Sequence, residues 1–392
     1  MTTQMRKGRR LNGALLIIAL TLLSAAVASA QTSTTTKTVA PTDTIDTTSV
    51  GLDAGVTSMA GDSNGNVYAS LQFSNKVVKL NGGGTVVGTF TVGRNPTGLI
   101  VDNANGLLYV LNNADNTISK LRLDGTVVST FSVAGDGPVH AALYGGTLYV
   151  ACERSNTLVR LAAADGTALG STVVGARPVW VVVGITTTRY SSFNGDSIST
   201  IGGSTEPTLT EEGSTTIDAS SEEAPTAGGS TPTGGSGTLS PDSGAISSPY
   251  KTTSTVSIYV ACNKENQVWK LSNAGGVVGK FITGRGPFGL ALNTKGEVLV
   301  ACFWDAVVQR LSSSGVVLSK TDVGDGPAGM IPYGNTVAVI SNGANSITRL
   351  SVTDGTFISK DLVDRSPLIG AATPSALWVA CTGTGTIARR AR

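Results

Sequence analysis

A unit of about 40 residues that recurs along most of the chain constrains its fold more than any other feature. Four copies are plain, at Tyr68–Leu80, Tyr109–Leu121, Tyr149–Leu161 and Tyr259–Leu271. Each begins with Tyr, carries Asn seven residues later and ends in Leu twelve residues after the Tyr. Strand-like segments repeated at a fixed period of this length predict a radial or stacked repeat architecture.

One full period, which starts at Gly93, predicts four short strands. A strand at 98–101 is followed by strands at 107–111, 117–121 and 126–133, with Gly, Asn and Asp in the turns between them. Such turns join neighbouring strands of an antiparallel sheet. The period therefore has the pattern of one blade of a β-propeller.

Alignment of equivalent positions gives seven units, which start at Tyr68, Tyr109, Tyr149, Tyr259, Leu299, Ala338 and Trp378. The sequence thus predicts an all-β, seven-bladed β-propeller of four-stranded antiparallel blades over residues 44–392. The last unit stops after its third strand, so an N-terminal strand within 44–50 would close the ring and remove an exposed sheet edge. Eight blades is the alternative, because Phe193–Ile201 resembles Ser341–Leu350.

The long gap between the third and fourth units holds an insertion at residues 184–255. It is rich in Ser, Thr, Gly and acidic residues and has few large apolar ones. Such a composition buries too little surface to offset the entropy of ordering, which predicts disorder over most of the segment. We interpret it as a tolerated surface loop; a glycosylated or partner-binding acidic tether is the alternative.

The N-terminus predicts a cleaved signal peptide at residues 1–30. Basic residues between Arg6 and Arg10 precede the apolar run Leu11–Val27, and Ala28-Ser29-Ala30 fits a cleavage site. A Thr-rich linker at 31–43 follows. The mature chain is expected to be secreted, or to reside in the periplasm or cell envelope, with no membrane span. An uncleaved anchor is the alternative, since the apolar run approaches spanning length.

Charge offers no sign of a polyanionic partner. The formal net charge is +2, and charged residues make up only 14% of the chain. No stripe of Lys and Arg follows a strand or loop. Nucleic-acid binding is therefore not expected.

The repeat resembles the YVTN family of β-propellers. The matching residues are Tyr109–Asn112, Asn116–Ile118 and the Gly-x-x-Pro turn Gly93–Pro96, whereas Cys152 and Cys262 stand where the family often has Asn. NHL-type and streptogramin-lyase-like propellers are more distant relatives. The resemblance implies the propeller fold, on which such proteins carry binding, scaffolding or enzymatic roles.

Aromatic and charged residues concentrate in blades 3 to 5, on one face. The Gly-x-x-Pro turns and the loops between the second and third strands of each blade should open onto that face. The candidate site residues are His140, Glu153, Arg177, Trp180, Arg285, Phe288, Phe303, Trp304 and Asp305. Polar groups beside aromatic surface are typical of a ligand or partner site. The alternative is an ordinary mixed-charge face with pore-lining side chains.

Enzymatic interpretations are limited because His140 is the only histidine. Metal sites built from several imidazoles are excluded, and no nucleophile motif stands out, so no catalytic residue is assigned. No metal or other cofactor is required, although Ca²⁺ or Mg²⁺ on oxygen ligands stays open. The Asp- and Asn-containing segments 62–66 and 102–106 resemble Ca²⁺ loops but are interpreted as tight turns.

The leading hypothesis is therefore a non-catalytic module for a protein or a small-molecule or glycan ligand. It predicts that replacing Trp180 and Trp304 with Ala abolishes binding without unfolding the protein. The alternative is a divalent-metal-dependent lactonase or lyase with His140, Glu153 or Asp305 as general base. A further alternative is an envelope or surface scaffold.

All four cysteines occupy the same position of the repeat unit, at Cys152, Cys262, Cys302 and Cys381. Equivalent atoms of different blades should lie too far apart for a disulfide. We expect small, buried packing residues; a ring of soft-metal ligands is the alternative.

Overall fold

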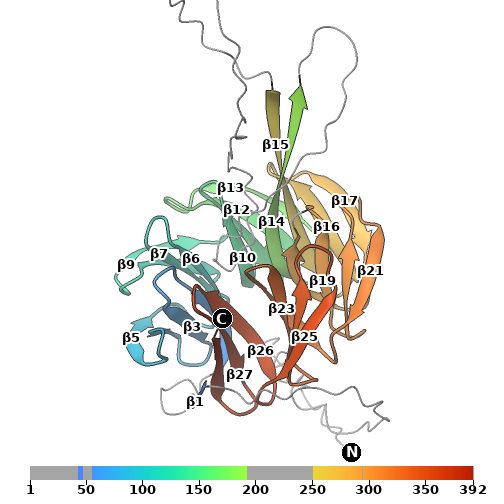
Figure 1. Ribbon diagram of the computed structural model, residues 1–392. Coiled ribbons are helices and arrows are strands. Elements are labelled where there is room, and N and C mark those ends of the chain that lie inside the picture. The colour runs from blue at the N-terminus through green and yellow to red at the C-terminus, as the bar shows by residue number, and fades with distance from the viewer. Residues whose placement is uncertain (1–42, 47–54, 192–249, 294, 392) are drawn as a thin grey trace, which may run out of the picture.

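The computed structural model describes residues 43–46, 55–191, 250–293 and 295–391. Seven four-stranded antiparallel sheets surround a central axis, and the described residues contain strands and turns but no helix (Figure 1). The predicted seven-bladed propeller is confirmed. The signal peptide, most of the linker and the segment Phe193–Ile201 lie outside the described residues. No helix in the described part of the chain is long and apolar enough to cross a membrane.

Each blade runs from an inner strand at the axis to an outer strand at the rim. Blade 1 comprises β2 (Val56–Gly61), β3 (Val67–Leu71), β4 (Lys76–Leu80) and β5 (Val86–Thr91). Blade 2 comprises β6 (Pro96–Asp102), β7 (Leu107–Asn112), β8 (Thr117–Arg122) and β9 (Val127–Ser132). Blade 3 comprises β10 (Pro138–Tyr144), β11 (Thr147–Cys152), β12 (Thr157–Ala162) and β13 (Ala168–Val173). Blade 4 comprises β14 (Pro178–Ser191), β15 (Tyr250–Cys262), β16 (Gln267–Ser272) and β17 (Val277–Ile282).

The remaining blades repeat this order. Blade 5 comprises β18 (Pro287–Leu292), β19 (Val298–Cys302), β20 (Val307–Leu311) and β21 (Val317–Asp322). Blade 6 comprises β22 (Pro327–Tyr333), β23 (Thr336–Ser341), β24 (Ser346–Ser351) and β25 (Phe357–Leu362). Blade 7 comprises β26 (Pro367–Thr373), β27 (Ala376–Cys381), β28 (Thr386–Ala391) and, as its outer strand, β1 (Asp43–Asp46). Because β1 pairs antiparallel with β28, the two ends of the described chain meet in one sheet.

The repeated Tyr links each of the first blades to the next. Tyr68 donates a hydrogen bond to the carbonyl of Leu123 in blade 2 at 3.0 Å, and Tyr109 donates to that of Ala163 in blade 3 at 3.1 Å. The Lys that precedes the final Leu of the unit assists, since Lys79 Nζ donates to the same Leu123 carbonyl at 3.0 Å. These bonds tie a buried phenol to a turn of the neighbouring blade.

The repeated Asn joins the blades at the other end of the strands. Its backbone has a positive φ of 51–56° at Asn75, Asn116, Asn156, Asn266 and Asn345. Asn tolerates this left-handed conformation better than most residues. Each side-chain Oδ1 accepts the backbone N–H of the third residue in the next blade's Gly-x-x-Pro turn, at 2.8–3.0 Å. The residue therefore fits both the turn and the interface between blades.

Blade 5 has Ala306 at this position, with a φ of 58°. We expect Ala306→Asn to stabilise the protein by about 1 kcal/mol, because it relieves left-handed strain and supplies an acceptor to the next turn. Thermal unfolding checks this through a higher Tm. Ala306→Gly is the control that relieves the strain without the acceptor. If Ala306→Asn were no more stable than Ala306→Gly, no such bond would form.

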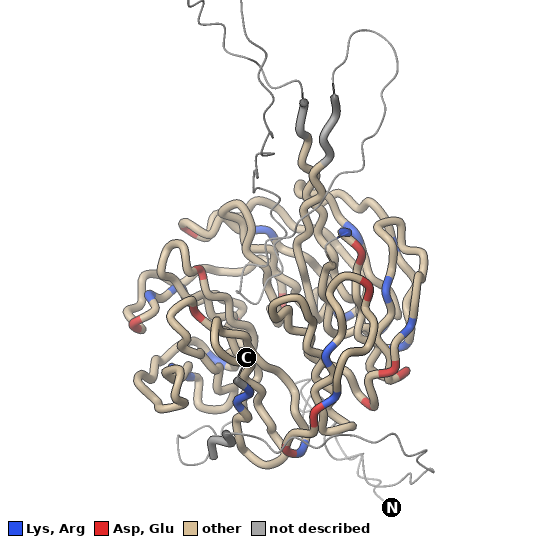
Figure 2. The backbone as a smooth tube through the Cα atoms, in the orientation of Figure 1, with Lys and Arg blue, Asp and Glu red and all other residues tan. Residues whose placement is uncertain are grey.

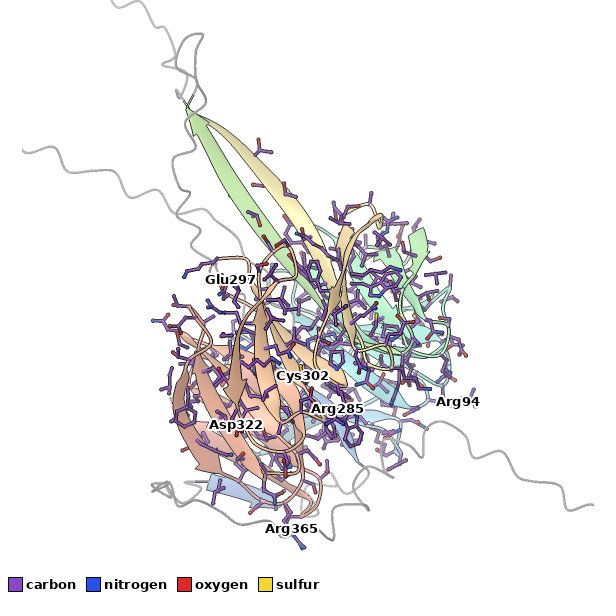
Figure 3. All side chains as sticks on the ribbon, turned by 90° about the vertical axis from the view of Figure 1, so that its right-hand side faces the viewer. Arg94, Arg285, Glu297, Cys302, Asp322 and Arg365 are labelled. Carbon is purple, nitrogen blue, oxygen red and sulfur yellow. The ribbon has the colours of Figure 1, made fainter. Side chains whose placement is uncertain are left out.

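The propeller has two distinct faces. On the first, which we call the turn face, the loop between the second and third strands donates a backbone N–H, at 2.8–3.0 Å in all seven blades, to the residue just before the inner strand. This acceptor belongs to a Gly-x-x-Pro turn in blades 2 to 6, whereas the turn of blade 7 begins with Asp364 and the acceptor in blade 1 is Gly55. On the opposite face, which we call the hairpin face, lie the other turns of the described blades. Figure 3 shows Glu297, from a hairpin-face turn, at the end from which β14 and β15 project, and Arg365, from the turn that leads into blade 7, at the opposite end.

The insertion begins later, and ends earlier, than its predicted bounds at 184 and 255. Strands β14 and β15 pair continuously from Pro178 opposite Cys262 to Ser191 opposite Tyr250. Residues 192–249 lie outside the described residues. The sequence at these bounds is rich in Thr, which is found in loops but whose branched Cβ also favours strands. The composition alone therefore did not distinguish a loop from a strand at these positions.

The four cysteines are free and buried, as predicted. Burial raises the pKa of each thiol to about 12. In blades 3, 4 and 5 the glycine that begins the turn before the inner strand packs on this position: a Cβ at Gly135 would lie 2.7 Å from Cys152 Sγ. The cysteines are therefore packing residues, and in these three blades they leave no room for a side chain at the first residue of the turn.

Candidate functional site

The nine candidate residues reach the turn face or the mouth of the central channel from three blades. Three lie on inner strands (His140 on β10, Trp180 on β14 and Phe288 on β18), Arg177 and Arg285 lie in Gly-x-x-Pro turns, and Glu153, Phe303, Trp304 and Asp305 lie in the loops after β11 and β19. The geometry divides them into a channel pair, an aromatic group and two ion pairs.

His140 and Trp180 form the channel pair. Their rings stack with centroids 4.2 Å apart and planes 23° apart. Both occupy the second position after the turn proline, where blades 2, 5 and 6 have Gly; at Gly98 and Gly289 a Cβ would lie 3.0 and 2.6 Å from a carbonyl oxygen of the next blade. Trp180 is only 7% exposed and belongs to the core of blades 4 and 5.

Apolar side chains meet across the axis at this level. Ile369, from β26 of blade 7, packs against the core cluster that blades 4 and 5 build on the other side of the ring. Phe288 packs against the same cluster. The channel mouth beside the His140–Trp180 stack is therefore filled by apolar groups.

The imidazole of His140 is held neutral. Val181 donates its backbone N–H to Nδ1 at 3.4 Å, and burial lowers the pKa to about 3. A neutral ring that accepts a hydrogen bond at Nδ1 carries its own proton on Nε2. His140 therefore stays uncharged throughout the physiological pH range.

This low pKa predicts acid sensitivity. The unfolded chain binds the His140 proton near pH 6.5 and the folded chain only near pH 3, so between these values stability falls as pH falls, by up to about 1.4 kcal/mol per pH unit. Denaturant unfolding from pH 7 to 4 measures the slope. In His140→Phe, which keeps a stacked ring without a titrating group, the slope should be shallower; equal slopes would contradict the assignment.

The aromatic group lies in blade 5. Phe288 and Phe303 have centroids 6.4 Å apart, and Phe303 meets Trp304 edge-on at 4.8 Å. Trp304 is 57% exposed, yet its backbone is fixed: its N–H donates to the carbonyl of Arg285 at 3.2 Å, and Arg285 Nη2 donates to its carbonyl at 3.1 Å. A rigid strip of rings thus runs from the channel mouth to solvent.

An ion pair borders this strip. Arg285 Nε donates to Asp305 Oδ1 at 2.7 Å, and the Arg285 backbone N–H donates to Oδ2 at 2.7 Å. This backbone N–H, followed by the guanidinium, holds the pKa of Asp305 below its ordinary value. The second pair joins two blades, with Arg177 Nε 3.4 Å from Glu153 Oε2. Figure 2 shows basic and acidic residues interspersed over the body.

Blade 2 provides an internal comparison. Arg94 and Asp115 form the same two contacts as Arg285 and Asp305, at 2.5 and 2.6 Å. The residue before the aspartate is Ala114 in blade 2 and Trp304 in blade 5. The Arg–Asp pair is therefore a structural element of the repeat, whereas the exposed indole is specific to blade 5.

The two carboxylates that could act as general base in the enzyme alternative are held in ion pairs. Glu153 and Asp305 each face an arginine, on different blades. Within the described ranges, no group of three or more His, Cys, Asp and Glu side chains is placed to hold a metal ion. The segments 62–66 and 102–106 form tight turns: Asp62 Oδ1 accepts the N–H groups of Asn64 and Asn66 at 3.0 and 2.8 Å, and Asp102 Oδ1 accepts that of Asn105 at 3.1 Å.

An exposed aromatic residue in a loop of the turn face was missed by the sequence reasoning. Phe73 is 59% exposed and occupies the same position of the repeat unit as Trp304, in blade 1. Apart from these two, the large apolar residues found exposed in the described chain lie on outer strands or, for Val316, in the turn just before one. Comparing the sixth residue of every unit would have found Phe73.

Comparison with known proteins places the chain in a fold and no further. No family model matches it, and no curated protein matches it. Solved structures do: a streptogramin B lyase at 16% identity covers 86% of this chain and 93% of its own, with a TM-score of 0.59. Virginiamycin B lyase from Staphylococcus aureus matches at 12% identity (88% and 97% covered, TM-score 0.61), and the WD40 β-propeller domain of Doa1 at 12% (88% and 94%, 0.57). At these identities the likeness establishes the propeller fold alone.

Proposed function

We propose that this protein is an exported YVTN-type propeller that binds a partner, without catalysis, through the blade-5 surface, defined as Arg285, Phe288, Phe303, Trp304 and Asp305. The observation that carries the proposal is the exposed Trp304 on a fixed backbone. The matching loop of blade 2 holds the same ion pair with Ala in its place. The turn therefore does not need the indole for its own structure.

The energetics favour recognition by apolar contact. Trp is among the residues that most often dominate binding energy, and a loop whose backbone is already held in place loses less entropy on binding. The guanidinium beside it is neutralised by Asp305, so it can form a polar rim but offers no free charge. The partner is a protein or a small-molecule or glycan ligand with an apolar surface.

Capture experiments test the proposal. Extracellular and envelope fractions are passed over immobilised protein, and captured species are compared with those on Trp304→Ala, which places at this position the residue that blade 2 has there. The proposal is supported by a ligand that the parent protein binds and for which Trp304→Ala lowers the affinity about 100-fold. Ala114→Trp is the matched control, because it adds an indole at the equivalent place in blade 2. A ligand that Trp304→Ala binds with unchanged affinity would refute the blade-5 surface.

The lyases among the similar structures motivate one alternative function, a metal-dependent lactonase or lyase. The geometry favours binding, because both candidate carboxylates are paired with arginine and His140 accepts a hydrogen bond at Nδ1. Thermal unfolding with Ca²⁺, Mg²⁺ or chelator, together with a screen for lactone opening, separates the two. A metal-dependent rise in Tm accompanied by turnover would replace the binding proposal.

A further inference from the structure

The hairpin of β14 and β15 extends beyond the body of the propeller as a ribbon of two strands (Figure 1). The third strand of the blade, β16, pairs with β15 only from Ser257 onward. Beyond that point seven further residue pairs continue, from Ile185 opposite Val256 to Ser191 opposite Tyr250. Among the described residues, β15 from Tyr250 to Val256 pairs with β14 alone, so its other edge is bare.

This edge has few of the features that keep exposed strands apart. The segment YKTTSTV contains no Pro or Gly, and the ladder has no bulge here, since its only register shift lies at Pro178 and Trp180. Natural edge strands avoid pairing by bulges, prolines and charged side chains, and Lys251 is the one charged residue of this segment. Thr253, Ser254 and Thr255 are exposed. The ribbon therefore presents main-chain donors and acceptors on a segment of strong strand-forming residues.

The ribbon receives no third strand from the rest of the described chain. A two-stranded ribbon is marginally stable in water. In the sequence, 58 residues separate Ser191 from Tyr250, so the two strands are not joined by a two-residue hairpin turn. A third strand on the bare edge would supply the missing stabilisation.

We propose that two copies of this protein pair through their β15 edges, antiparallel about a twofold axis near Thr253, to form a four-stranded sheet. The segment suits self-pairing because Thr252 to Thr255 is a run of hydroxyl residues in either direction. In the twofold register, hydroxyl residues of one copy lie opposite hydroxyl residues of the other, which is a favourable cross-strand combination. The Lys251 residues of the two copies do not lie opposite each other in this register. The added strand continues the sheet of blade 4, and the two propeller bodies lie at opposite ends of it.

Analytical ultracentrifugation over a range of concentrations tests this inference, which does not depend on the proposed function. The purified protein is expected to show a monomer–dimer equilibrium. Thr253→Lys and Thr253→Glu place like charges opposite each other at the axis, so each alone should weaken the dimer roughly tenfold or more. An equal mixture of the two variants should dimerise again, because the charges are then opposite in sign.

Thr186→Lys is the matched control, since it adds the same charge to β14 rather than to the β15 edge; it should leave the dimer intact.

Thr253→Cys gives a second measurement. The four native cysteines are buried, so mild oxidation should yield a disulfide-linked dimer through residue 253. A protein that stays monomeric at every concentration, or a dimer that both Thr253 charge variants leave unchanged, would overturn the inference.

Discussion

Replacing Trp180 with Ala is expected to lower the free energy of unfolding by about 3–5 kcal/mol. The indole is 7% exposed, stacks on His140 and lies in the core cluster of blades 4 and 5. Truncation would leave a cavity between two blades, which the surrounding strands can fill only in part. Denaturant unfolding of the parent and the variant measures the difference.

Trp304→Ala is the control for this prediction. Its indole is 57% exposed, so its removal should change stability by no more than about 0.5 kcal/mol. The sequence treated the two tryptophans alike, as surface residues replaceable without unfolding; the structure places Trp180 in the core. Equal stabilities of the two variants would contradict this division.

Gly289→Ala is expected to destabilise the protein by about 2–3 kcal/mol. A Cβ at this position on β18 would lie 2.6 Å from the carbonyl oxygen of Ala328 and 2.9 Å from Met330 Cγ, both on β22 of blade 6. A backbone oxygen cannot move aside without shifting the inner strand. The Tm of the variant, read by circular dichroism, should fall accordingly.

Gly82→Ala is the matched control. It lies in a turn on the hairpin face, where a Cβ would meet nothing closer than 3.5 Å. Its stability should be unchanged or slightly higher, because Ala restricts the unfolded chain. If Gly289→Ala were as stable as this control, the inner strands would be less closely packed than the structure indicates.

The repeat pattern predicted the fold because the forces behind it are local and recur in every blade. The spacing of Tyr, Asn and Leu in four units, together with the alignment of three less regular ones, predicted seven blades and the face on which each turn lies. The structure adds the reason for two of these residues: the Asn and Tyr side chains bond to the next blade. Such bonds span about 20 to 55 residues, so one unit by itself cannot reveal them.

The candidate site was predicted in part. Alignment of the units found the loop that carries Phe303, Trp304 and Asp305, since position in the repeat sets the face. It could not show that Asp305 is matched by Arg285 in the way that Asp115 is matched by Arg94. These ion pairs could be found only from the distances between a turn and a loop that lie about 20 residues apart in the sequence.

The sequence by itself determined the four-stranded blade and most of the residues on the turn face, and it favoured seven blades over eight, because strand period and turn chemistry are local. Only the tertiary structure decided which aromatic rings are buried, how far β14 and β15 extend, and which charges are neutralised. These depend on how neighbouring blades pack and on which atoms the ring closure brings together. Two tryptophans of the same face can therefore differ, with Trp180 in the core of blade 4 and Trp304 at the surface of blade 5.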